Sequence, residues 1–139
     1  MAVFNKISAF VEAICEKKHN LGSDVLKIML TNSAPIASNT VKANLTDISA
    51  GNGYTAGGTA VTITTSAQTA GLYTLIGDDV VFTASGGSIG PFRYAALYND
   101  TATNDELIGW WDYGASITLL TGESLTVELD PTNGILTVQ

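Results

Sequence analysis

Cysteine, histidine and charged residues are scarce in this chain, and each scarcity narrows what the protein can be. The single cysteine, Cys15, excludes an internal disulfide, and the single histidine, His19, leaves no second histidine ligand for a zinc site. Charged residues make up 14% of the 139 residues, against about 25% in typical soluble domains, so we expect a partner to cover part of the exterior. No apolar run approaches the roughly 20 residues of a membrane-spanning helix, so we expect no membrane partner.

The few charges are unevenly distributed. Residues 1–42 contain five lysines and three acids, a net charge of +2, whereas residues 43–139 contain one arginine and ten acids, a net charge of −9. Phosphate binding requires clustered Lys and Arg, so we expect no nucleic-acid partner. The N-terminal stretch has acids within its apolar pattern and no small-residue cleavage site, and we therefore expect a chain made in a cytoplasm.

Hydrophobic periodicity predicts one helix followed by many strands. A helix is expected over about 3–17, with an apolar stripe of Val3, Phe4, Ile7, Phe10, Val11, Ile14 and Cys15. From about residue 24 the apolar period becomes two, and turn sequences separate short segments. The expected strands are 24–30, 60–66, 72–76, 79–84, 91–99, 106–113, 115–120, 123–129 and 134–138. This pattern predicts a single mainly β domain over 1–139, an antiparallel jelly-roll-like sandwich with one N-terminal amphipathic helix.

The segments 91–99 and 106–113 are expected to form a hairpin rich in aromatic residues. A loop centred on 100–105 pairs residues whose numbers sum to 205, which places Arg93 opposite Asp112 and Ala96 opposite Gly109. Aromatic side chains then line one face of the hairpin. We expect the N-terminal helix or a partner protein to cover them. The predicted interface residues are Trp110, Trp111, Tyr94, Tyr98 and Phe92, together with Tyr54 from the loop 51–58.

Residues suited to catalysis or metal binding are few. His19 follows Lys17 and Lys18 at the expected helix end, where we expect a solvated side chain, and Cys15 lies on the apolar stripe, where we expect a buried thiol. The acidic stretches 78–79 and 99–106 do not follow a calcium-loop spacing, so turns are expected there, with calcium binding as the alternative. We expect no enzyme activity, no cofactor and no metal.

Three phrases of the sequence resemble those of a known class of proteins. "GNGYTAGG" (51–58), "FTASGGSIGPFRYAALYNDT" (82–101) and "LIGWWDYG" (107–114) are similar to small decoration, or cement, proteins of tailed bacteriophages. The resemblance implies a β-rich, often jelly-roll, fold, assembly into dimers or trimers, and a place on the capsid exterior. There such proteins bind the major capsid protein over subunit junctions and resist the internal pressure of the DNA.

Two functions of different classes follow as hypotheses. The first is a non-enzymatic cement protein that stabilises contacts between capsid subunits. The second is a receptor- or glycan-binding component of a phage tail or fibre, because exposed Trp and Tyr rings stack well on sugars.

Overall fold

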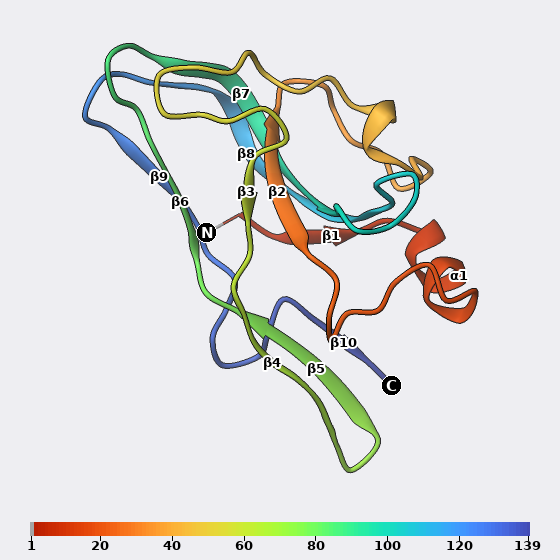
Figure 1. Ribbon diagram of the computed structural model, residues 1–139. Coiled ribbons are helices and arrows are strands. Elements are labelled where there is room, and N and C mark those ends of the chain that lie inside the picture. Colours follow the sequence, from red (N-terminus) through yellow and green to blue (C-terminus); the bar gives the residue numbers. More distant parts are fainter. Residues whose placement is uncertain (1) are drawn as a thin grey trace.

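The computed structural model describes residues 2–139, which form antiparallel strands with one short helix, α1, at one side (Figure 1). The elements are β1 (Phe4–Lys6), α1 (Ala9–Cys15), β2 (Leu26–Thr31), the 3-10 turn η1 (Lys42–Asn44), β3 (Thr59–Ala60), β4 (Ile63–Thr69), β5 (Leu72–Gly77), β6 (Val80–Thr83), β7 (Ile89–Asn99), β8 (Leu107–Leu119), β9 (Ser124–Val127) and β10 (Leu136–Val138). Within the described residues the sheets have the orders β1-β8-β7-β2-β3, β10-β5-β4 and β6-β9, and all their strand pairs are antiparallel. The predicted mainly β, antiparallel architecture is therefore confirmed.

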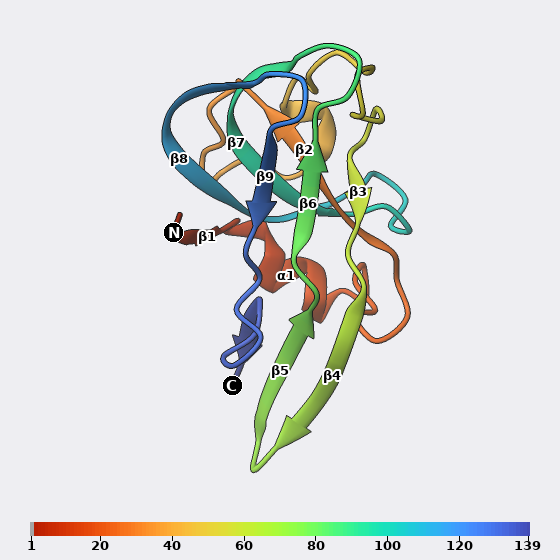
Figure 2. The ribbon, with the colours of Figure 1, turned by 90° about the vertical axis from the view of Figure 1, so that its left-hand side faces the viewer.

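The second half of the chain is one long antiparallel ribbon, defined here as residues 72–99 paired with residues 107–138. Strand β7 pairs with β8 next to the loop 100–106, β6 pairs with β9 further out, and β5 pairs with β10 at the far end. Figure 2 shows β6 and β9 side by side, with β5 and β10 continuing below them. Strands β2 and β1 flank the β7–β8 hairpin, and β4 extends the β5 end of the ribbon. The ribbon thereby brings the C-terminal strand close to α1.

The helix is shorter than the sequence predicts. Residues 4–6 form strand β1 instead, because they pair with residues 109–111 of β8. The chain then turns, and α1 ends before Lys17, whose φ of 64° lies in the left-handed region that stops a helix. Among residues 2–139 no helix is both long and apolar enough to cross a membrane.

The apolar stripe of the helix is only partly covered. Phe10 and Ala13 are buried in the core, whereas Val11 is 52% exposed and Ile14 is half-buried. Cys15 is exposed, so the prediction of a buried thiol is wrong. The cause is the shortened helix, which turns its Phe10 side toward the sheet and leaves the Val11 side open.

The register of the central hairpin differs from the prediction by one residue over most of its length. Ala96 lies opposite Trp110, not Gly109, whereas Tyr98 keeps its predicted partner Leu107, and the backbone N–H of Asn99 donates to the carbonyl oxygen of its predicted partner Glu106. An irregularity separates the Ala96 and Tyr98 pairs, and a larger one follows nearer the ribbon's outer end. Strand β8 also runs unbroken over residues 107–119, where two strands were expected. Bulges of this kind depend on tertiary packing, which sequence pairing rules do not include.

The predicted contact between Arg93 and Asp112 is nevertheless present. The Nε and Nη2 atoms of Arg93 donate to the two carboxylate oxygens of Asp112 over 2.8 and 2.9 Å. Arg93 and the backbone N–H of Gly114, which donates to the same carboxylate, lower the pKa of Asp112 below its ordinary value. The ion pair therefore forms across the irregular part of the hairpin rather than across a regular cross-strand position.

Candidate interaction site

The two tryptophans point to opposite faces of the sheet. Trp111 pairs with Phe4 of β1, their ring centroids lie 5.0 Å apart, and Trp111 is only 4% exposed. Trp110 pairs with Asn5 and is half-buried. Phe4 of β1 thus packs on Trp111, and Trp110 keeps partial access to solvent.

The other predicted interface residues belong to the core. Phe92, Tyr94, Tyr98 and Tyr54 are all buried, so only Trp110 of the six predicted residues retains partial exposure. Aromatic residues in a strand look alike in sequence whether a partner or the chain's own loops cover them. For this reason the sequence pattern could not distinguish a surface that a partner covers from one that the chain covers itself.

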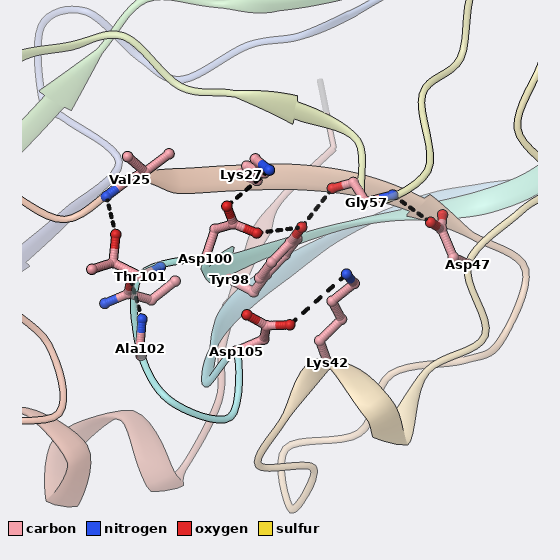
Figure 3. Close-up of polar contacts among 11 residues, drawn as sticks. Val25, Lys27, Lys42, Asp47, Gly57, Tyr98, Asp100, Thr101, Ala102 and Asp105 are labelled. Atoms are coloured by element: carbon pink, nitrogen blue, oxygen red, sulfur yellow. Dashed lines mark hydrogen bonds and ion pairs between the residues drawn. The ribbon is translucent and has the colours of Figure 1, made fainter.

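The hydroxyl groups of two buried tyrosines are bound within the fold. Tyr54 donates to the carboxylate of Asp47 and accepts from the backbone N–H of Leu30. Tyr98 donates to the carbonyl oxygen of Gly57 over 2.7 Å, as Figure 3 shows. Burial is the main reason why the pKa of each tyrosine is raised above its ordinary value. These bonds fasten the loop 51–58 onto the central sheet.

Acidic residues around Tyr98 are paired with lysines rather than free. Lys27 Nζ lies 2.8 Å from Asp100 Oδ2, and Lys42 Nζ lies 3.9 Å from Asp105 Oδ2 and 4.8 Å from the centre of the Tyr98 ring (Figure 3). Within residues 2–139, no three His, Cys, Asp or Glu side chains come together in a group suited to a metal ion. The network holds the loop 99–106 against its neighbours and gives the acidic stretch a structural role.

An open apolar groove runs between α1 and the C-terminal strand. It consists of two adjoining hollows of about 530 and 330 Å³, which share Ile14 and Val138 as walls. The sequence analysis missed this site, although the uncovered half of the helical stripe was its signal. Its main apolar residues are Phe10, Val11, Ile14, Leu21, Tyr73 and Val138.

His19 is one of the residues that line this groove, and its hydrogen bonds define the tautomer of the neutral ring. The Oδ1 atom of Asn99 accepts from the backbone N–H groups of Thr101 and Ala102, so its Nδ2 atom must face His19 Nδ1, 3.0 Å away. Nδ1 therefore accepts, and the imidazole proton is on Nε2. Among the described residues, this buried Nε2 has no hydrogen-bond partner.

The environment of His19 disfavours the protonated form of its ring. Burial lowers the pKa of His19 below its ordinary value and outweighs the opposite effect of the nearby carboxylates of Glu106 and Asp24, while Lys18 adds to the lowering. His19 is 7% exposed, so the prediction of a solvated side chain is wrong. The segment after α1 folds back over β7, which brings the ring against Phe10 with a centroid distance of 5.3 Å.

Comparisons with known proteins give no match: no model of a protein family, no curated protein and no solved structure matches this chain. Its function is therefore argued from the residues and their geometry.

Proposed function

We propose that this chain is a non-enzymatic virion structural protein that binds the outside of a phage capsid and stabilises contacts between major capsid subunits. The proposal starts from the three phrases that resemble decoration proteins. Two of them, 82–101 and 107–114, include the central hairpin, and the third, 51–58, packs beside it. A Cβ atom at Gly53 would overlap the carbonyl oxygen of Thr83, and one at Gly58 would overlap that of Ile28. These two glycines of the phrase 51–58 are therefore required by close backbone packing in this fold.

The topology supports the finer proposal of a jelly-roll-like sandwich. In such folds a long antiparallel ribbon bends over to form facing sheets. The ribbon of residues 72–138 has the required nested pairing, and its pairs belong to three separate sheets. Assembly into a dimer or trimer is part of the same proposal.

The observation that carries the proposed role is the open apolar groove. Val11 is 52% exposed and Val138 is 38% exposed on its walls, so a partner would remove apolar surface from water there. Burial of apolar surface contributes about 25 cal/mol per Å² before the costs of association are subtracted. Repeated sites on one shell would convert such a modest contact into firm attachment through avidity.

The alternative of a receptor- or glycan-binding tail component now depends on Trp110, which is half-buried, because Trp111, Tyr94 and Tyr98 are buried. The burial of these rings also moves the proposed capsid contact away from the hairpin and toward the groove.

Addition of the purified chain to capsids that lack it tests the role. We expect copies in fixed ratio to the major capsid subunit, counted by quantitative mass spectrometry, and a higher temperature of DNA release. Val11→Asp should reduce the number of bound copies because it places a charge on the groove wall. Val81→Asp is the matched control, because Val81 is also 52% exposed but lies on β6. Unchanged capsid resilience, or copies confined to the tail, would contradict the proposal.

A further inference from the structure

We propose that the groove between α1 and β10 binds an extended segment of the major capsid protein in which apolar and acidic side chains alternate. The naming of this partner rests on the proposed function. The chemistry of the segment rests on the groove itself, where an apolar wall and two lysines lie together.

The charges along the groove are opposite to those of the whole molecule. The chain has 13 acidic and 6 basic residues, yet Lys6 and Lys17 are the charged side chains that line the groove, and no described Asp or Glu side chain lines it. These lysines attract acidic groups to the groove, and the acidic residues of the remaining surface repel such groups elsewhere. Charge complementarity therefore selects an acidic occupant.

The shape of the groove favours an extended segment. Strand β10 ends the order β10-β5-β4, so within the described residues one of its edges has no strand beside it. Thr137 and Val138 point to opposite faces of β10, and both line the groove, which places this edge along it. An added strand can pair with such an edge through its backbone while alternate side chains enter the groove. Val11 and Ile14 on α1 form the apolar wall that these side chains would meet.

The polar groups of the groove include the hydroxyls of Ser66 and Tyr73, which lie 2.7 Å apart and offer hydrogen bonds to a bound segment. His19 also lines the groove, but its Nε2 atom is buried beneath the surface and is not a contact for the segment.

A peptide in which leucine and aspartate alternate provides the probe, and its leucine–asparagine analogue is the neutral control. Fluorescence anisotropy should show that the acidic peptide binds at least about tenfold more tightly than the neutral one. Lys17→Glu should remove this preference, whereas Lys18→Glu should not. The two variants change the net charge equally, but Lys17 lines the groove and Lys18 lies by a separate hollow beside Ala9 and Thr40.

Two further readouts locate the peptide. Cys15 is the single cysteine, is exposed and lines the groove, so bound peptide should slow its alkylation by iodoacetamide. The ring resonances of His19, the single histidine, should shift on binding because His19 lines the groove.

Three results would overturn the inference: no binding of the acidic peptide, equal binding of both peptides, or equal losses in Lys17→Glu and Lys18→Glu. Capsid attachment that survives Lys17→Glu would leave the proposed function standing without this inference. Peptide binding in the groove without capsid attachment would do the reverse.

Discussion

At the scale of single residues, the closest approaches of backbone to backbone decide where glycine is required. Gly58 has a φ of 82°, and a Cβ atom there would overlap the carbonyl oxygen of Ile28 on β2. We expect Gly58→Ala to lower the free energy of unfolding by about 3 kcal/mol, because a steric overlap adds to left-handed strain. Gly86→Ala is the control: its φ is 77° but no atom lies near, so about 1 kcal/mol is expected. Urea denaturation of both variants measures the difference.

His19 makes stability depend on pH. In the unfolded chain its pKa is about 6.5, and burial lowers the pKa in the folded chain. Below about pH 6.5 the unfolded state therefore binds a proton that the folded state resists, and stability falls as the pH falls. Above this pH the contribution is fully present.

Urea denaturation at about pH 7.5 and 5.5 checks this dependence on both sides of the ordinary pKa of histidine. His19→Gln should lose less stability between these two conditions than the unaltered chain, since glutamine does not titrate. Equal losses would show that other groups cause the pH effect.

Some single-residue contacts could be predicted from sequence and others could not. The pairing of Arg93 with Asp112 followed from opposite charges on neighbouring strands, and it survived a wrong register because a long arginine side chain tolerates a shift. The environments of His19 and Cys15 were predicted wrongly, since each depends on how a distant segment folds over or away from α1.

At the scale of elements, local pattern located most strands but not the start of the chain. The apolar spacing over residues 3–17 fits a helix, yet residues 4–6 gain backbone hydrogen bonds and an aromatic contact as β1. Tertiary pairing therefore outweighs local periodicity there. The strands from β5 to β10 lie close to their predicted positions, because turn sequences separate most of them.

Strand β1 should contribute measurably through one side chain. Phe4 packs on Trp111, so we expect Phe4→Ala to lower the free energy of unfolding by about 2 kcal/mol, less than for a fully buried ring because Phe4 is half-buried. Tryptophan fluorescence should also shift to longer wavelength as Trp111 becomes wetter. Val3→Ala, at a position that is 75% exposed, should change neither quantity appreciably. Equal effects in the two variants would argue that β1 contributes through its backbone alone.

At the scale of the whole molecule, the groove shows why a candidate site escaped prediction. Its walls come from residues 6–22 and from residues 66–139, and only the fold brings these together. The sequence did show the two ingredients, a lysine-rich beginning and an acidic remainder. Only the structure shows that two of the lysines line the groove and that no described Asp or Glu side chain does so.

The nested ribbon also sets an order of assembly. Once the turn at 100–106 brings β7 and β8 together, each later pair needs to close only a short gap, so the entropy cost of every step stays small despite the long sequence separation. We therefore expect the pair β7–β8 to form first, β6–β9 next and β5–β10 last. Amide hydrogens in the middle of β7 and β8 should exchange with deuterium most slowly, and those of β5 and β10 most quickly. Slower exchange in β5 and β10 than in β7 would contradict this order and would indicate that β5 and β10 pair first.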